Sequence, residues 1–130
     1  MAATKTPHSI CISTGNITWT NMPAASTELF GLVHRRIKKD FTDVDTIRLS
    51  ARVSTIGTAG AVLQAQYSTD ESAWNTLTTN TLTLSSTGTK VTSWENIPSG
   101  AKADVFVRIV GSGGDGVVDP VLGNIYVEYL

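Results

Sequence analysis

This sequence of 130 residues has few charged side chains, and it is poor in the residues that favour helices. Asp, Glu, Lys and Arg together make up 16% of the chain, against about a quarter in an ordinary globular protein. The chain is poor in the helix-favouring residues Ala, Leu, Glu and Lys. It contains instead 19 Thr, 12 Ser and 11 Gly, which suit strands and turns. This composition argues against a helical bundle or a coiled coil. Because 41% of the residues are hydrophobic and their periodicity is clear, it argues against disorder as well.

The sequence also lacks a surplus of positive charge. Ten Lys and Arg against eleven Asp and Glu give a formal net charge of −1 and an isoelectric point near 6.0. A dedicated duplex-DNA or RNA binder needs a basic surplus to displace phosphate counterions, so we expect no nucleic-acid partner. Near-neutrality gives little repulsion between copies, which suits a protein that works in an assembly.

Cysteine, long apolar segments and a leader peptide are equally scarce. The one cysteine, Cys11, cannot form an internal disulfide, and the apolar run Ser9–Ile12 around it predicts a buried thiol. No window approaches the apolar length of a membrane span, and residues 1–7 hold no hydrophobic region of a secretory signal. We therefore expect no membrane partner and synthesis in the cytoplasm, with exit only inside a larger particle or by lysis.

What the sequence does contain is alternation of apolar and polar residues, the pattern of half-buried strands. Four segments show it clearly: Thr46–Ser54, Ala61–Ser68, Ala103–Val110 and Asn124–Tyr129. Weaker segments are Ser9–Ile12, Asn16–Thr20, Leu29–Ile37, Trp74–Leu77, Thr81–Leu84 and Lys90–Trp94. In the four clear segments we expect the apolar positions to face the core: Ile47, Leu49, Ala51, Val53, Leu63, Ala65, Tyr67, Val105, Val107, Ile109, Ile125, Val127 and Tyr129.

Many short strands separated by Gly-, Ser- and Asn-containing turns predict an all-β fold. We expect an antiparallel β-sandwich, and among sandwiches and small barrels we favour a jelly roll. The length allows one domain and no second core. We divide the chain into a flexible or docking arm over residues 1–8 and a single β-sandwich domain over residues 9–130.

Residues that carry catalytic or metal chemistry form no convincing cluster in the sequence. The spacing of His8, His34 and Cys11 suggests neither a nucleophilic relay nor a zinc site. Asp115 and Asp119 flank a loop where they could bind Ca²⁺, although a solvated loop explains them as well. We therefore expect no enzyme and no cofactor.

The segment Tyr67–Trp74 predicts a tight hairpin with an aromatic residue at each end. It resembles the Asp-box hairpin of sialidases, Ser-x-Asp-x-Gly-x-Thr-Trp, but it is one residue short and has Ser72 in place of the glycine. In that motif the carboxylate bonds to the amides of the turn, a role that Asp70 would take here. The resemblance implies a structural hairpin and no chemistry.

The polar sides of the four clear strands are rich in Arg, Gln and aromatic residues and contain no Lys, which is typical of interfaces. If these strands share one sheet, their polar sides form one continuous surface; the alternative is a plain solvent-facing sheet with cross-strand pairs. The basic run His34–Lys39 is interpreted as a solvated strand end or a subunit contact, with an anion patch as the alternative. The candidate interface residues are Arg35, Arg36, Arg48, Arg52, Gln64, Gln66, Phe106, Arg108 and Tyr126, with Ser50 and Glu128 on the same polar sides.

Residues 45–130 resemble the galactose-binding-like jelly roll. The segments that carry the resemblance are Arg48–Val53, Gln66–Trp74, Trp94–Pro98, Val107–Val110 and Gly123–Tyr129. Such domains occur as carbohydrate-binding modules and as accessory proteins of phage particles. The high Thr and Ser content and near-neutral charge of a free-standing domain are similar to phage capsid decoration (cement) proteins. The resemblance carries over no functional residue.

From these observations we expect a non-catalytic virion accessory protein, such as a capsid decoration protein that stabilises an assembled shell. Its partners would be a protein lattice and further copies of itself, for example in a trimer at a symmetry axis of the shell. The alternative is a carbohydrate-binding module in which exposed tryptophans stack on sugar rings. The candidate stacking residues are Trp19, Trp74 and Trp94.

Overall fold

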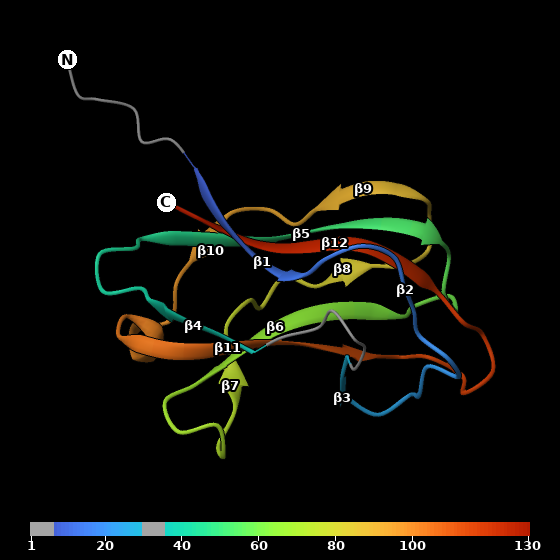
Figure 1. The fold of residues 1–130 in the computed structure, drawn as a ribbon, viewed down its shortest axis with the longest axis horizontal. Coiled ribbons are helices and arrows are strands. Elements are labelled where there is room, and N and C mark those ends of the chain that lie inside the picture. Colours follow the sequence, from blue (N-terminus) through green and yellow to red (C-terminus); the bar gives the residue numbers. More distant parts are fainter. Residues whose placement is uncertain (1–6, 30–35) are drawn as a thin grey trace.

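The computed structural model describes residues 7–29 and 36–130 and shows two antiparallel sheets packed face to face (Figure 1). The first sheet contains β1 (His8–Ser13), β2 (Ile17–Thr18), β5 (Thr46–Thr55), β9 (Gly88–Val91), β10 (Glu95–Asn96) and β12 (Val121–Tyr129). The second contains β3 (Thr27–Glu28), β4 (Ile37–Asp40), β6 (Val62–Ser68), β7 (Asn75–Thr76), β8 (Leu82–Thr83) and β11 (Asp104–Ser112). The expected antiparallel β-sandwich is confirmed.

The strand order is that of a jelly roll. In each sheet two long strands form the centre, β12 with β5 and β11 with β6, and short strands line both edges. Each edge position is shared by two successive short strands, namely β1–β2, β3–β4, β7–β8 and β9–β10. When each such pair is counted as one interrupted strand, the chain has eight strands, which we number 1 to 8 in chain order. Their spatial order is then 1-8-3-6 in the first sheet and 2-7-4-5 in the second. This order contains the two Greek keys that define a jelly roll.

The core lies between the sheets and consists of the apolar sides of the long strands. The inward residues of β5, β11 and β12 that alternation predicted are buried, with the exception of Tyr129, which is half-buried. In β6, Leu63 and Ala65 are buried, whereas Tyr67 is half-buried and its ring packs at the rim of the core. Burial of a Leu, Ile or Val side chain stabilises the folded state by about 1.5–3 kcal/mol, so this interface between sheets accounts for most of the fold's stability.

Trp19 is part of this core, with 7% of its surface exposed. It packs against Gly111 of β11, where a Cβ atom would lie 2.5 Å from the indole ring. Its backbone N–H donates to the carbonyl of Pro120. The missing side chain at position 111 therefore leaves room for the largest ring in the core.

Several local predictions need adjustment. Strand β1 begins at His8, which the sequence placed in the arm, and residues 1–6 lie outside the described residues. Cys11 is half-buried rather than buried, because it lies on the outer side of β1 opposite Tyr126. Most of the predicted strand Leu29–Ile37 lies outside the described residues, and β4 begins only at Ile37.

Helical structure in the described part of the chain is limited to one 3-10 turn, η1 (Ser99–Ala101). The same part of the chain has no helix with the length and apolarity needed to span a bilayer.

Candidate functional site: the two outer faces of the sandwich

The polar surface predicted from the four clear strands is divided between two opposite sides of the molecule. Arg48, Ser50, Arg52, Tyr126 and Glu128 lie on β5 and β12 in the first sheet, whereas Gln64, Gln66, Phe106 and Arg108 lie on β6 and β11 in the second. The condition for one continuous surface, that these strands share a sheet, is therefore not met. Alternation shows which side of a strand is polar, but it does not show which sheet the strand joins.

We call the outer side of the first sheet the open face, because the Arg52 guanidinium near its centre has no hydrogen-bond or ion-pair partner among the described residues. Two of its strands run antiparallel with Ser50 opposite Tyr126, and β9 places Val91 on the other side of Ser50. Val91 is 52% exposed. One end of this face is closed by Arg48, whose Nε donates to Glu128 Oε1 over 3.1 Å and whose guanidinium lies 4.4 Å from the ring centre of Trp94.

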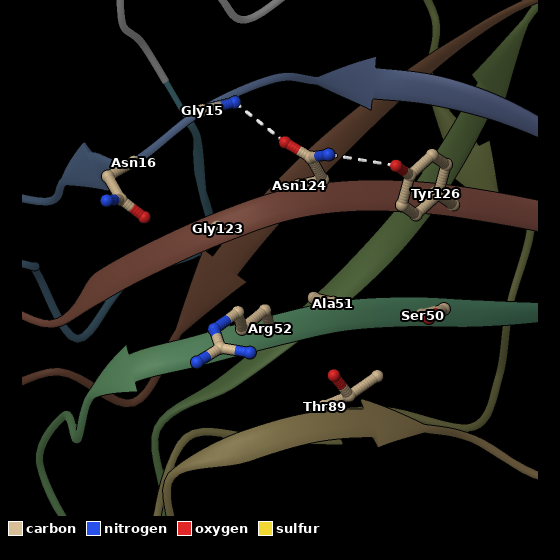
Figure 2. Close-up of a pocket in the computed structure, with 9 residues that line it drawn as sticks. All are labelled: Gly15, Asn16, Ser50, Ala51, Arg52, Thr89, Gly123, Asn124 and Tyr126. Carbon is tan, nitrogen blue, oxygen red and sulfur yellow. Dashed lines mark hydrogen bonds between the residues drawn. The ribbon is translucent and has the colours of Figure 1, made fainter.

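A depression of about 350 Å³ lies at the centre of the open face (Figure 2). We call it the Ser50 depression; its lining residues are Gly15, Asn16, Ser50, Ala51, Arg52, Thr89, Gly123, Asn124 and Tyr126. Several of these lining residues are small, namely Gly15, Ser50, Ala51 and Gly123. Asn124 is fixed in place: its Oδ1 accepts from the Gly15 N–H over 2.7 Å and its Nδ2 donates to the Tyr126 hydroxyl over 2.9 Å.

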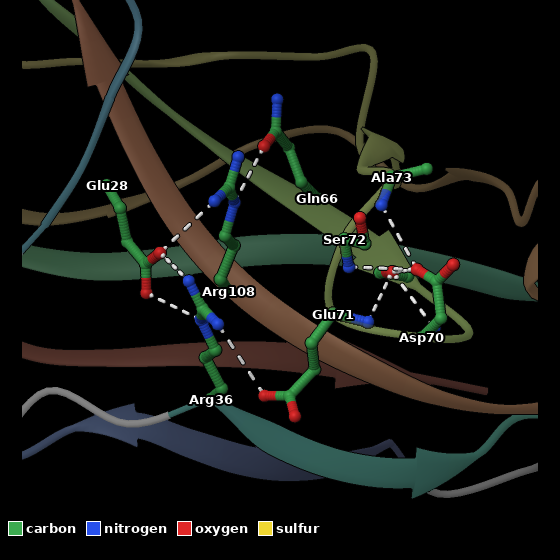
Figure 3. A network of polar contacts seen from close by, with 9 residues as sticks. Glu28, Arg36, Gln66, Asp70, Glu71, Ser72, Ala73 and Arg108 are labelled. Carbon is green, nitrogen blue, oxygen red and sulfur yellow. Dashed lines mark hydrogen bonds and ion pairs between the residues drawn. The ribbon is translucent and has the colours of Figure 1, made fainter.

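The outer side of the second sheet, the braced face, differs because its charged groups bond to one another (Figure 3). Glu28 of β3 accepts from Arg36 Nη2 over 2.7 Å and from Arg36 Nε over 3.1 Å. Arg108 Nη1 donates to the same carboxylate over 3.1 Å. Only 6% of the Glu28 side chain is exposed, against 35% and 20% for the two arginines. The Glu28 carboxylate holds the pKa of Arg36 above its usual value, chiefly through the hydrogen bond between them.

Further contacts extend this arrangement across the sheet. Arg108 Nε donates to Gln66 Oε1 over 2.9 Å, and Arg36 lies 3.6 Å from Glu71. The guanidinium carbons of Arg108 and Arg36 lie 4.2 and 5.0 Å from the ring centre of Trp74. We call Glu28, Arg36, Gln66, Trp74 and Arg108 the arginine cluster. Four separate segments of the chain are joined in it through charge-assisted bonds and cation–π contacts.

The hairpin between β6 and β7 positions Trp74 in this cluster. Asp70 Oδ1 accepts from the N–H groups of Ser72 and Ala73 over 2.8 and 3.0 Å and from the Ser68 hydroxyl over 2.9 Å. These hydrogen bonds, first that from Ser72, lower the pKa of Asp70. The structural role predicted for Asp70 is confirmed.

The residues of the basic run His34–Lys39 that the structure describes contact different partners. Lys38 points to the braced face, 3.4 Å from Asp104 and 5.3 Å from the ring centre of Phe106. Lys39 lies over the ring of Tyr129 at 5.0 Å. Arg36 joins the arginine cluster, while Arg35 lies outside the described residues.

The three tryptophans that were candidates for stacking on a sugar lie in different surroundings. Trp19 is buried in the core and is unable to stack on a sugar, which corrects that assignment. Trp74 and Trp94 are half-buried on opposite faces, and each has an arginine over its ring. An aromatic wall for a sugar is instead available from Tyr126 of the Ser50 depression.

The loop carboxylates Asp115 and Asp119 bond to backbone amides. Asp115 Oδ1 accepts from Val118 and Val117, both over 2.9 Å, and these bonds lower the pKa of Asp115. Asp119 Oδ1 accepts from the Asn21 N–H over 2.7 Å. Within the described residues no three His, Cys, Asp or Glu side chains are grouped so as to hold a metal ion.

Some residues of both faces were not singled out in the sequence. Glu28 belongs to a strand of two residues, which is too short for alternation to reveal. The depression contains Asn16 and Asn124, and each follows a glycine; this repeated Gly-Asn pair is the signal that could have identified them.

Comparison with models of known protein families, and with curated protein sequences, gave no match for this chain. The chemistry of the two faces therefore carries the functional inference.

Proposed function

We propose that this chain is a non-catalytic virion accessory protein, a capsid decoration protein that binds an assembled shell through its braced face. The observation that carries the proposal is the arginine cluster, a preformed group of Arg and aromatic side chains on an outer sheet face. Arg, Trp and Tyr are the residues most often found at the energetic centre of protein interfaces.

The geometry of the cluster favours association because its side chains are already ordered. Arg36 and Arg108 are held by Glu28 and by the ring of Trp74, so little of their rotamer freedom remains to be lost on binding. Lys38, Asp104 and Glu71 surround the cluster and remain more exposed. A packed aromatic and arginine centre with a charged rim is the usual layout of a protein interface.

The fold and composition support a role in a shell. A jelly roll with low charge and near-neutral balance has little electrostatic repulsion between copies, so many copies can lie close together on a lattice. A protein that binds only the assembled shell stabilises that state by mass action. We expect a closed homo-oligomer, specifically a trimer that sits on a symmetry axis of the shell. Light scattering tests this expectation by measuring the mass of the protein in solution.

Co-sedimentation tests the proposal directly. The full chain is mixed with assembled phage capsid shells, and separately with the unassembled major capsid protein of the same shells. Pelleting with shells and no association with free subunits is the expected result. Equal association with both, or with neither, would refute the proposal.

A matched pair of variants assigns the contact to one face. Phe106→Ser removes an apolar side chain from the braced face, and Val91→Ser removes one from the open face. We expect the first to weaken shell binding about tenfold or more and the second to leave it unchanged. Lys38→Glu reverses an exposed charge beside Phe106 and provides a second braced-face variant that does not affect the core. Shell binding lost equally in the Val91 variant would exclude the braced face as the contact.

A further inference from the structure

We infer that the Ser50 depression is a binding site for a carboxylated sugar, a pyranose ring that bears one carboxylate, as in a hexuronic acid. This inference does not rest on the proposed attachment to a shell. The depression lies on the open face, which points away from the braced face in a two-layer sandwich.

The backbone creates the depression. Leu122 pairs with Val53 and Ile125 with Ala51, so Gly123 and Asn124 together oppose the single residue Arg52 in a β-bulge. Bulges redirect side chains and are common beside functional sites. Here the bulge places the Asn124 amide at the edge of the depression while Gly123 contributes no side chain to its floor (Figure 2).

The bulge also positions Arg52. A Cβ atom at Gly123 would lie 3.0 Å from the Cβ and 3.3 Å from the Cδ of Arg52. The aliphatic stem of the arginine therefore lies directly against the glycine, and Arg52 lines the depression from β5. Among the residues that the structure describes, none forms a hydrogen bond or an ion pair with this guanidinium.

The polar groups around the depression are predominantly hydrogen-bond donors. The Tyr126 oxygen accepts from Asn124, so its own O–H proton is available for a ligand. The Asn124 amide has a second N–H proton, and Arg52 offers the five donors of its guanidinium. The Thr89 hydroxyl and the Asn16 side chain add groups that either donate or accept.

The charge of the lining determines the class of ligand. Among the described residues that line the depression, Arg52 is the one charged residue and none is Asp or Glu. On the same face, Glu128 is bonded to Arg48. By contrast, a second cavity of about 370 Å³ is lined by Lys39 together with Asp40 and Asp43, so two carboxylates face its one lysine. A guanidinium without a partner binds a carboxylate through two parallel hydrogen bonds.

Size and shape then favour a sugar acid over a bare anion. The volume of about 350 Å³ falls in the range of small-molecule sites and exceeds what an isolated carboxylate would fill. The ring of Tyr126 provides an apolar wall, and the donors of Asn124 and Tyr126 lie apart from Arg52 across the small residues of the floor (Figure 2). A hydroxylated ring engages both groups of donors at once.

Titration of the ¹⁵N-labelled full chain with sodium glucuronate, followed by NMR, tests the inference. We expect saturable shifts at the amides of Arg52, Asn124 and Tyr126. Glucose, sodium acetate and sodium sulfate serve as parallel probes, and each should bind at least about tenfold more weakly, because each lacks either the carboxylate or the ring.

Each other result is decisive against the inference. Equal binding of glucose would show that Arg52 does not select a carboxylate. Equal binding of acetate or sulfate would reduce the site to one for small anions. The absence of saturable shifts with glucuronate, or shifts confined to other parts of the chain, would remove the site altogether.

Variants connect binding to the named residues. Arg52→Ala should weaken glucuronate binding about tenfold or more, and Arg52→Lys should weaken it less because the charge remains while the paired donors are lost. Tyr126→Phe removes one hydroxyl donor and keeps the ring, so a smaller loss is expected. Lys102→Ala removes the same charge at a distant surface position and should bind as the parent chain does. Unchanged binding by Arg52→Ala, with a dispersed amide spectrum that confirms folding, would overturn the inference.

The shell-binding proposal and the sugar-binding inference can be tested independently of each other. Phe106→Ser should lose shell binding and keep the glucuronate shifts, whereas Arg52→Ala should lose the shifts. Failure to bind shells would therefore leave the sugar site unaffected, and the absence of glucuronate shifts would leave the shell proposal unaffected.

Discussion

The two outer faces of this sandwich contain similar side chains and arrange them in opposite ways. Arg108 and Arg52 both lie on a long central strand, and both point outward. Arg108 bonds to Glu28 and Gln66 and lies over Trp74, whereas Arg52 lies against a glycine with its guanidinium in solvent. The difference arises from the neighbouring chain: β3 provides a carboxylate beside Arg108, and the bulge in β12 provides a glycine and an amide beside Arg52.

This comparison separates two uses of an arginine on a β-sheet. An arginine bonded on several sides contributes to stability and gives a face a fixed shape, which suits contact with a large rigid partner. An arginine without a partner contributes little to stability and keeps its hydrogen-bonding capacity for a ligand. Substitutions at matched positions on the two faces should therefore affect different properties.

The largest difference is expected between Glu28 on the braced face, which bonds to Arg36 and Arg108, and Glu128 on the open face, which bonds to Arg48. Glu28→Ala removes a buried carboxylate and leaves Arg36 and Arg108 without it, which should lower the free energy of unfolding by about 3 kcal/mol. Glu128→Ala on the open face breaks a partly exposed pair with Arg48 and should cost about 1 kcal/mol. Urea denaturation of both variants measures the difference. Equal losses in the free energy of unfolding would show that the two carboxylates contribute equally to stability, which would contradict the difference between the faces.

A second substitution tests the core beneath the faces. Gly111→Ala places a methyl group against the Trp19 ring, and such overpacking should lower the free energy of unfolding by about 1–3 kcal/mol. Intrinsic fluorescence should report a changed environment for Trp19. Gly116→Ala is the control for a position with open space, although its positive φ adds some strain of its own. A neutral Gly111→Ala variant would mean that Trp19 is not packed as described.

The fold could be predicted from the sequence because its long strands carry the signal. Alternation over β5, β6, β11 and β12 identified the central strands of both sheets, and their inward residues are the core. Strands of two residues, such as β3 and β10, gave no such signal because alternation needs several positions to appear. The jelly-roll order also depends on which edge each pair of short strands joins.

The candidate site was less accessible to prediction, for a reason that applies to sandwiches in general. Period-two alternation reports the polar side of each strand, and the assignment of strands to sheets depends on contacts between residues far apart in sequence. Arg52 and Arg108 were therefore recognised as outward-facing, but the sequence left open whether their strands share one sheet. The bulge at Gly123 that makes the depression depends on pairing with β5, and the sequence of β12 alone does not contain that information.

A smaller effect is expected on acidification, and the hairpin beside the braced face is one place where it should appear. Hydrogen bonds from Ser72 and Ala73 lower the pKa of Asp70 in the folded state, so its contribution to stability is present above the unfolded-state pKa of about 4 and is lost as pH falls through the lower folded value. Asp70→Asn should reduce this acid dependence, and Thr69→Ala in the same turn should keep it. Amide NMR below pH 4 should show changes at Ser72 and Ala73 before those at Asn16 and Asn124. These two asparagines line the Ser50 depression, whose described lining contains no Asp or Glu. The reverse order would contradict the assignment of Asp70 as the acid-sensitive group.

The smallest effect on stability is expected at the residue with the largest expected effect on sugar binding. Arg52→Ala removes an exposed guanidinium that has no hydrogen-bond or ion-pair partner among residues 7–29 and 36–130, so the free energy of unfolding should change by less than about 0.5 kcal/mol. Arg108→Ala removes the bonds to Glu28 and Gln66 and should cost at least about 1 kcal/mol. The pair of urea curves is informative because the two substitutions are chemically identical and both strands are central. A stability loss at Arg52 equal to that at Arg108 would show that Arg52 is bound within the protein, and the open face would then have no free guanidinium to offer a carboxylate.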